Sequence, residues 1–373
     1  MELNDFKKEV AGALKTAGIT INGDKPYDVK VRNDDFFERV LAEGELGLGE
    51  SYMDDWWECD ALDKLINKAL RSNLADCMKK NWSMVWHSLK SRIYNLQKLS
   101  RAFQVGEIHY DTGNDLFSAM LDENMIYTCG YWKDADSLEQ AQIAKMDLIC
   151  RKIGLSSDMK ILDIGCGFGG FAKYAAENYD VHVTGVTVSK EQAKLASEKC
   201  NGLSVDIQLE DYRQIFGQFD RVVSIGTFEH MGYKNYRSYV QKVHDLLTDN
   251  GVTLLHTIGG NISSTTTNQW TAKYIFPNGM IPSIAQIGKA MEGLFVMEDW
   301  QNFGEHYDKT LMAWYTNFKR AWPELKKGYS DRFYRMWEYY LLSCAGAFRA
   351  RELQLWQIVM TKKGMNQPDC RIN

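Results

Sequence analysis

The sequence lacks several features that mark particular classes of protein. No window approaches the roughly 18 uninterrupted apolar residues of a membrane-spanning helix, so no segment is expected to cross a bilayer. The eight cysteines are scattered without a C-x-x-C pair, which argues against zinc and against a redox couple. We therefore predict no metal site, and thiols that are reduced and mostly buried. A net charge of −5 gives no reason to expect nucleic acid as a partner.

A secretory signal is not expected either. The first residues, Met1 to Lys8, include acids where a signal peptide would be basic and then apolar, and we therefore expect a cytoplasmic protein. At 373 residues the chain is long for one compact domain. One large domain with a smaller attachment is the default expectation for this length.

The first hundred residues predict a small, mainly helical domain. Helical patterns cover 6–17 and 34–42, and a strand-like alternation at Val29 and Val31 separates them. The segment 44–57 has too many glycines for a helix interior. Its aromatic and apolar side chains suit either core packing or a docking surface.

The segment 64–101 is strongly basic. It holds nine lysines and arginines against one acid, Asp76, which gives a local charge of +8, and apolar residues run through it. Such a segment suits an anionic membrane surface, where each nearby cation contributes about 1 kcal/mol. A solvated helix face packed on its own domain is an equally good interpretation, and this segment alone does not decide between them.

Strands and helices alternate beyond residue 106, which is typical of an α/β fold with a largely parallel sheet. Ligand-binding loops of such sheets lie at the carboxyl ends of the strands. The predicted strands are 160–164, 181–186, 204–209, 221–225, 252–256 and, at the end of the chain, 353–361. Helices are predicted after the first two strands and at 236–247, 307–318 and 329–350.

The most informative local motif is the run from Lys160 to Gly170, where a strand, a glycine loop and a helix start follow one another. Its glycines alternate, at Gly165, Gly167 and Gly169. This spacing differs from the G-x-G-x-x-G dinucleotide fingerprint and favours S-adenosylmethionine over NAD. A tight turn without a ligand is the alternative.

The next two strand ends offer further contacts to a nucleoside. Many nucleoside-binding sheets carry a ribose-binding acid where this chain has Thr187, and that difference weakens a generic assignment. Gln192 offers the sugar a hydrogen bond instead, and Ser189 has capping-box spacing to Gln192. Glu210 and Asp211 either accept the adenine amino group or are solvated loop charges.

Glu229 and His256 follow the fourth and fifth strands. At neighbouring strand ends they can meet in one cleft and orient a base, a bound anion or a water, and positioned proton transfer is worth about 10²–10⁴ in rate. A satisfied buried histidine is the alternative for His256, but its place beside the glycine loop favours a functional role. The carboxyl-terminal third is rich in aromatic rings, most of them expected in the core and a few suited to an acyl-chain tunnel.

Several longer motifs, spread over nearly the whole chain, are similar to those of a known enzyme family. They are GLGESYMDDWWECD at 47–60, HYDTGN at 109–114, YTCGYW at 127–132, the loop at 160–170, FEH at 228–230, HTIG at 256–259, YIFPNG at 274–279, LMAWY at 311–315 and CAGAFRAR at 344–351. With these motifs the chain resembles the bacterial cyclopropane-fatty-acyl-phospholipid synthases. Mycolic acid cyclopropane synthases share the catalytic part but lack the amino-terminal domain.

The resemblance implies an activity and a domain plan. The activity is transfer of a methylene unit from S-adenosylmethionine to the cis double bond of unsaturated acyl chains in membrane phospholipids. A cyclopropane ring forms by way of a carbocation, which a bound bicarbonate deprotonates. The plan is a lipid-binding and dimerisation domain at 1–96, a linker at 97–106 and a Rossmann-like class I S-adenosylmethionine-dependent methyltransferase domain at 107–373.

The resemblance also implies site residues. The bicarbonate site would comprise Cys129, Glu229, His256, the backbone of Ile258, and Tyr307. The donor site would comprise Tyr127, Thr128, Asp163, Gly165, Cys166, Gly167, Gly169, Thr187, Gln192, Glu210 and Asp211. Cys344 matches a cysteine sometimes regarded as catalytic, but its apolar helical setting favours a buried structural thiol.

By the same resemblance the protein is a homodimer that lies peripherally on anionic lipids at the inner face of the membrane. Two other functions compete with this interpretation. One is a methyltransferase that acts on nitrogen or oxygen of a head group or small molecule. The other is a lipid-surface binding protein that retains an inactive nucleoside fold.

Overall fold

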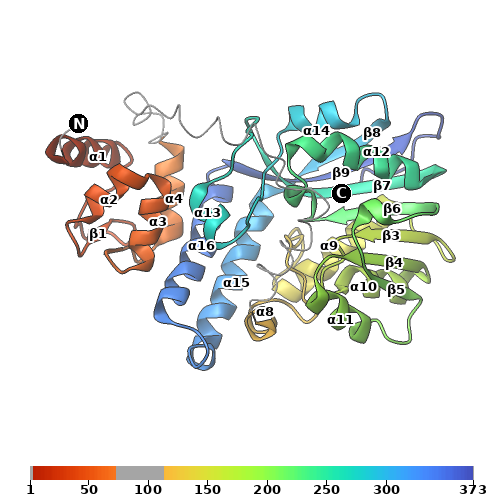
Figure 1. Cartoon of the computed structure of the whole chain (residues 1–373), viewed down its shortest axis with the longest axis horizontal. Helices are drawn as coiled ribbons and strands as arrows, with labels where there is room; N and C mark the ends of the chain where they lie inside the picture. Colours follow the sequence, from red (N-terminus) through yellow and green to blue (C-terminus); the bar gives the residue numbers. More distant parts are fainter. Residues whose placement is uncertain (1–2, 73–112, 373) are drawn as a thin grey trace. The chain divides into compact units, whose positions relative to one another are not determined.

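The computed structural model describes residues 3–72 and 113–372, which fall into two compact units (Figure 1). The first unit holds the described residues up to 72 together with 266–277 and 307–353. The second holds 113–265, 278–306 and 354–372. The predicted linker at 97–106 lies outside the described residues. No helix in the described ranges is long and apolar enough to span a membrane.

The first unit is mainly helical, as predicted for the amino-terminal residues. Its elements are α1 (Leu3–Thr16), β1 (Lys30–Val31), α2 (Phe36–Glu43), α3 (Glu45–Met53), β2 (Trp57–Glu58), α4 (Leu62–Arg71), α13 (Gln269–Tyr274), α15 (Gly304–Leu325, from Tyr307 onward) and α16 (Asp331–Arg349). Two of its segments, 266–277 and 307–353, come from the part of the chain predicted as the catalytic domain. The compact units therefore do not follow the sequence-based boundaries, and the functional division into domains stays a prediction.

Helix α3 corrects the expectation that 44–57 is too glycine-rich for a helix. Gly47 and Gly49 lie inside it because the helix packs too closely for side chains there. A Cβ at Gly49 would come 2.3 Å from the Trp270 ring of α13, and one at Gly47 would come 2.5 Å from the Arg39 carbonyl oxygen. The glycines therefore serve helix packing, and their cost in helix propensity is offset by the contacts they permit.

The start of the basic segment lies on α4, where two of its three described cations make contacts inside the first unit, while Lys64 is exposed. The Lys68 ammonium lies 4.6 Å from the Tyr27 ring centroid and donates to the Ala17 carbonyl at 3.4 Å. Arg71 donates to the Arg349 carbonyl at 3.1 Å. These two contacts fit the interpretation of a helix face packed on its own domain. The rest of the segment lies outside the described residues.

The second unit contains a seven-stranded sheet in the order β5-β4-β3-β6-β7-β9-β8. Its strands are β3 (Lys160–Ile164), β4 (His182–Thr187), β5 (Val205–Leu209), β6 (Phe219–Ile225), β7 (Leu247–Gly260), β8 (Phe295–Asn302) and β9 (Leu353–Lys362). Its helices are α8 (Asn114–Met120), α9 (Leu138–Lys152), α10 (Gly170–Tyr179), α11 (Lys190–Lys199), α12 (Tyr236–Leu246), α14 (Ile284–Met291) and the 3-10 turns η1 (Tyr212–Gln214), η2 (Phe228–His230) and η3 (Tyr233–Asn235).

The sheet confirms the predicted strands and adds one. Strands β3 to β7 pair in parallel, whereas β8 runs antiparallel to β9. The sequence analysis missed β8, which carries exposed and acidic positions that hide its alternation. It also ended β7 early, since this strand continues past His256 to Gly260.

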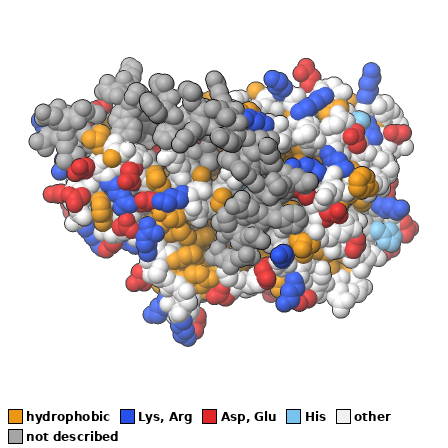
Figure 2. Space-filling view, in the orientation of Figure 1, with side chains coloured by type: hydrophobic (Ala, Val, Ile, Leu, Met, Phe, Trp, Pro, Cys, Tyr) orange, Lys and Arg blue, Asp and Glu red, His pale blue; other side chains and the backbone are white. Residues whose placement is uncertain are grey.

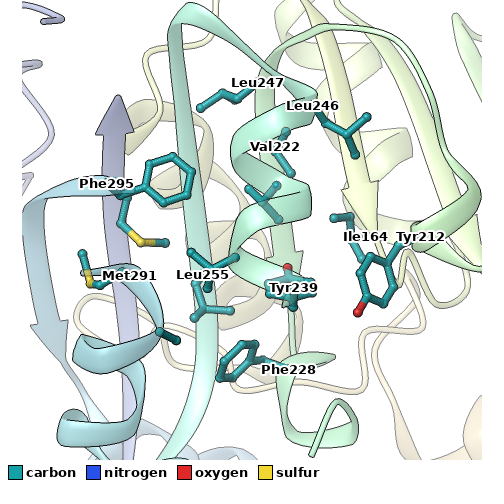
Figure 3. Packing of buried hydrophobic residues seen from close by; sticks show 14 of the residues in the cluster. Ile164, Tyr212, Val222, Phe228, Tyr239, Leu246, Leu247, Leu255, Met291 and Phe295 are labelled. Carbon is teal, nitrogen blue, oxygen red and sulfur yellow. The ribbon is translucent and has the colours of Figure 1, made fainter. Parts of the chain in front are cut away.

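Both faces of the sheet are covered, so neighbouring residues of one strand enter different cores. Leu162 and Val222 join a cluster under α12 and α14, part of which Figure 3 shows. Ile161 and Val223 join the opposite cluster under α9 and α10. This alternation fixes the strand register, because a shift of one residue would exchange the two faces. The carboxyl ends of the parallel strands are thereby held in place.

Candidate active site

A cavity of about 190 Å³ lies at the carboxyl ends of β3, β4, β5 and β6. All of the predicted donor-site residues except Gly169 line it: Tyr127, Thr128, Asp163, Gly165, Cys166, Gly167, Thr187, Gln192, Glu210 and Asp211. The structure therefore gathers these residues from four separate segments around one space. Gly169 instead ends the turn as the N-cap of α10, with φ of 78°.

The turn after β3 requires glycine at Gly165. Its φ of 78° is left-handed, and a Cβ there would come 2.0 Å from the Thr227 hydroxyl oxygen. That hydroxyl donates to the Ile164 carbonyl at 3.1 Å and so ties the turn to the loop after β6. A side chain at this position would displace the loop that forms the opposite wall of the cavity.

The loop after β4 differs from its predicted capping box. The Ser189 hydroxyl caps α11 by accepting from the Gln192 N–H at 3.3 Å, as expected. The Gln192 side chain does not return to the Ser189 backbone, because its Oε1 accepts from the Thr187 hydroxyl at 2.9 Å. Both side chains are buried at the cavity wall, where the Gln192 amide nitrogen is the donor that this pair leaves for a ligand.

The acids after β5 have different surroundings. Asp211 is buried, and Arg213 donates to both of its carboxylate oxygens at 2.7 Å. Glu210 is bound through its backbone N–H, which donates to the Thr187 carbonyl at 3.0 Å. Of the two predicted acceptors for an adenine amino group, Glu210 is therefore the carboxylate that does not already hold an arginine.

Sequence reasoning missed a buried lysine at this cavity. Lys145 of α9 lines it, is 1% exposed and donates to the Thr128 hydroxyl at 2.9 Å. Burial lowers the pKa of Lys145 to about 8, against the charges of Asp122, Cys129 and Asp163. Burial likewise raises the pKa of Asp163 to about 7, which Lys145 opposes. A lysine at helical spacing from Ala141, Leu148 and Ile149 was the signal available in the sequence.

Glu229 follows β6 and is buried. The backbone N–H of Ile258 donates to its Oε1 at 2.7 Å. Its Oε2 is enclosed and has no hydrogen-bond partner among the described residues. Burial raises the pKa of Glu229 to about 7, although the hydrogen bonds from Ile258 and Thr257 favour the charged form.

His256 lies on β7 two residues before Ile258 and is 1% exposed. Gln357 on β9 places its amide nitrogen 3.3 Å from Nδ1, and the Phe303 ring packs against the imidazole. With an amide N–H on Nδ1, the ring proton belongs on Nε2, which is buried without a partner in the described chain. Burial lowers the pKa of His256 well below its ordinary value, so the ring is neutral.

The remaining predicted residues divide between the units. Cys129 is fully buried beside Thr128 in the second unit. Tyr307 belongs to the first unit, where its ring packs on Trp314 and Phe348. Cys344 lies on α16 in the same unit, and burial raises its pKa to about 12, which fits a structural thiol. All described cysteines are free, and each is buried except Cys344, which is half-buried as a residue although its thiol is enclosed.

Glu229 and His256 together present two buried polar atoms that lack partners. A carboxyl with a raised pKa donates a hydrogen bond in its protonated form, and a neutral imidazole donates through Nε2. Two such donors suit an anion or a polarised oxygen. Within 3–72 and 113–372 there is no cluster of three or more histidine, cysteine or acidic side chains able to hold a metal.

The strand order, the glycine turn and the cavity at the strand ends define the class I S-adenosylmethionine-dependent methyltransferase fold, which confirms the predicted fold class. Solved structures agree. Cyclopropane synthase MmaA2 from Mycobacterium tuberculosis matches with a TM-score of 0.66 at 32% identity, covering 70% of this chain and 98% of its own. Mycolic acid cyclopropane synthase CmaA1 complexed with SAH and CTAB matches with a TM-score of 0.66 at 33% identity, with the same coverage.

The chain belongs to the mycolic acid cyclopropane synthetase family, whose model matches residues 97–358. It is 56% identical over 349 residues to the cyclopropane-fatty-acyl-phospholipid synthase of Escherichia coli strain K12, covering 94% of this chain and 91% of that protein. The resemblance inferred from the motifs is thereby confirmed. The chain is an enzyme, an S-adenosylmethionine-dependent methyltransferase.

Proposed function

We propose that this enzyme transfers a methylene unit from S-adenosylmethionine to the cis double bond of an unsaturated acyl chain in a membrane phospholipid. The similarity to the Escherichia coli phospholipid synthase over 94% of the chain supports this substrate class. The observation that carries the chemistry is the buried pair of Glu229 Oε2 and His256 Nε2, both without partners in the described residues. Transfer to a nitrogen or oxygen would need no such enclosed anion site.

The proposed reaction makes two carbon–carbon bonds. Transfer of the methyl group breaks its bond to sulfur, joins one alkene carbon and leaves positive charge on the other. When bound, bicarbonate would accept a proton from the new methyl group, and the electron pair of that C–H bond would close the ring. The alkene is a poor nucleophile, so the protein must hold the base against a developing cation, which is electrostatic positioning as much as proton transfer.

In this proposal Glu229 and His256 hold the bicarbonate as hydrogen-bond donors. The Ile258 N–H already donates to Glu229, so its contribution is to orient the carboxyl, whose second oxygen faces the ligand. Cys129 supplies a buried wall of the same site and no nucleophile. The parts given to Tyr307 and Cys344 by the resemblance stay predictions, and the surroundings of Cys344 argue against catalysis.

The donor would occupy the cavity beside the glycine turn. Backbone approaches it at Gly165 and Gly167, the Gln192 amide nitrogen suits a ribose hydroxyl, and Glu210 suits the adenine amino group. This assignment is supported by the complex of the related CmaA1 with SAH. The sulfonium of the donor supplies an activated methyl group.

We also propose that the enzyme acts as a homodimer at the inner face of the membrane, on anionic lipids. Figure 2 shows hydrophobic side chains gathered over α16, where Phe333 and Met336 are half-buried. An apolar surface of this kind suits acyl chains. Sedimentation of the protein with vesicles of anionic phospholipid should weaken as salt rises, because ions screen surface attraction. Vesicle binding that does not change with salt concentration would contradict the proposed electrostatic attraction to anionic lipids.

The function is tested by incubating the purified enzyme with S-adenosylmethionine and vesicles of unsaturated phospholipid. Mass spectrometry of the released fatty acids should find chains one methylene heavier that lack the double bond. His256→Leu should abolish this product while donor binding persists. Unchanged acyl chains with proven donor binding would contradict the proposal, and methylated head groups in their place would favour a nitrogen or oxygen methyltransferase.

A further inference from the structure

Helix α9 turns two buried polar side chains toward one short segment. Gln142 is fully buried and donates to the Thr128 carbonyl at 2.8 Å and to the Ile126 carbonyl at 3.5 Å. Lys145, one turn later, donates to the Thr128 hydroxyl at 2.9 Å. The Tyr131 N–H donates to the Ala141 carbonyl of the same helix at 2.8 Å. Segment 126–131 is therefore held against α9.

This segment connects the donor cavity to the strand end that carries His256. Tyr127 and Thr128 line the cavity, and Cys129 follows them. The Thr128 methyl packs on Gly226, where an added Cβ would come within 2.5 Å of it. The Gly226 N–H in turn donates to the His256 carbonyl at 2.9 Å. The Lys145 ammonium thus lies within a few contacts of both sites.

The proposed bicarbonate site has no positive charge of its own. Cys129 is a buried thiol, Glu229 is neutral when it donates, and His256 is neutral. A buried anion without a nearby cation is costly. The lining of the donor cavity includes two cationic side chains, Lys145 and Arg213. Arg213 is bound to Asp211 and its side chain is 32% exposed, so Lys145 is the buried cation.

No carboxylate neutralises Lys145 directly. Its ammonium forms no ion pair within 4.0 Å in the part of the chain that the structure describes, and Thr128 is its hydrogen-bond acceptor there. By contrast Lys152, the other buried lysine of α9, is paired with Asp299 at 2.9 Å. The two lysines lie on one helix and are similarly buried. Only Lys152 has a carboxylate of the described chain as an ion-pair partner.

We propose that Lys145 supplies the positive charge that holds the bicarbonate, while its hydrogen bond to Thr128 fixes the segment that carries Cys129. This inference rests on the proposed function. It makes Lys145 a positioning residue for the base and not a proton donor or nucleophile. A lysine that merely supports the fold would affect donor and bicarbonate alike, whereas a charge partner acts chiefly on the anion.

The test is a bicarbonate titration of the full-length enzyme in decarbonated buffer at fixed ionic strength. Lys145→Met keeps the side-chain length without the charge, and Lys145→Arg restores the charge. Arg151→Met, which removes an exposed cation from the same helix, is the control. Lys145→Met should raise KM for bicarbonate at least tenfold, Lys145→Arg should raise it less, and Arg151→Met should match the wild type. Calorimetry without bicarbonate should find a smaller loss of donor affinity than of bicarbonate affinity, because Lys145 and Thr128 also line the donor cavity.

The outcomes separate this inference from the function on which it rests. An unchanged KM for bicarbonate in Lys145→Met, or a parallel loss of donor affinity, overturns the role of Lys145 and leaves the proposed reaction standing. A wild-type enzyme that ignores bicarbonate overturns the base and this inference together. If Lys145→Met does not fold, Thr128→Val decides, since it releases the ammonium without removing it and should raise KM for bicarbonate severalfold. An unchanged KM in that variant overturns the proposal.

Discussion

The backbone N–H of Ile258 donates a 2.7 Å hydrogen bond to Oε1 of Glu229 and so fixes the orientation of this buried carboxyl. The other oxygen, Oε2, is left without a partner in the described residues. Because burial raises the pKa of Glu229 to about 7, this oxygen is protonated and donates below that pH, and it repels anions above it. Several consequences can be measured.

Bicarbonate affinity should fall as the pH rises through about 7, the pKa of Glu229. Glu229→Gln carries an amide donor at every pH and should lose this dependence, although its turnover will be lower because the amide geometry differs. The measurement is KM for bicarbonate from pH 6 to 8.5 in both proteins. Equal slopes for the two proteins would contradict a neutral Glu229 as donor.

The same carboxyl should impose a pH dependence on folding stability. Its pKa rises from 4.5 in the unfolded chain to about 7 in the folded protein. The free energy of unfolding of the wild type, relative to that of Glu229→Gln, is therefore greatest below pH 4.5. This advantage is lost as the pH rises through 7. The full loss is about 3 kcal/mol. Urea unfolding of both proteins at pH 5 and pH 8 checks the sign, and a constant difference would contradict it.

The glycine turn can be tested with a matched pair of variants. Gly165→Ala places a methyl group on the Thr227 side chain and should lower donor affinity at least tenfold. Gly202→Ala, outside the cavity lining, meets no atom within 4 Å, and its left-handed φ of 83° should cost about 1 kcal/mol of stability. Donor titration calorimetry and thermal unfolding separate the two effects. Equal donor affinity in both variants would argue against the tight turn as the cause.

In the first unit, Glu50 should be a stabilising carboxylate. It accepts from Lys273, Tyr274 and Arg39, and despite burial these partners lower its pKa from 4.5 to about 2. Its contribution is therefore present above pH 4.5 and is lost as the pH falls through 2. Glu50→Gln should destabilise the unit by about 3 kcal/mol at neutral pH.

Glu43→Gln is the control for Glu50. It removes another acid bound to Arg39, but Glu43 is 43% exposed and the contact is 3.4 Å long. Exposed pairs contribute about 0–1 kcal/mol, so this variant should unfold close to the wild type. Urea unfolding of the two variants compares them. Equal destabilisation would mean that the burial of Glu50 is not what makes its pairing matter.

The sheet and most residues that line the cavity at its carboxyl edge could be predicted from the sequence because they depend on local patterns. Strands of apolar residues that carry Asp163, Thr187 and His256 toward their carboxyl ends indicate both the parallel fold and the edge where such sheets bind ligands. The alternating spacing of the glycines favours S-adenosylmethionine over NAD as the ligand. Chemistry beyond that came from the family motifs, since the pattern alone left His256 open between structure and function.

What the sequence missed depends on contacts between distant segments. Helix α3 forms although it contains Gly49, because the Trp270 ring packs where a side chain at Gly49 would be. The Gln192 side chain prefers Thr187 to the capping box. Lys145 becomes notable when its burial beside the cavity is known. Of these contacts, only the one between Thr187 and Gln192 joins residues that are close in sequence.

The central claim is that a new methyl group loses a proton to bicarbonate and closes a ring on the acyl chain. A donor whose methyl group is fully deuterated tests it directly, with vesicles of unsaturated phospholipid and added bicarbonate. The account predicts acyl chains that lack the double bond and keep two of the three deuterium atoms. They should form in proportion to bicarbonate with the wild-type enzyme and be absent with His256→Leu. Products that keep all three, or transfer to a head group, would contradict it.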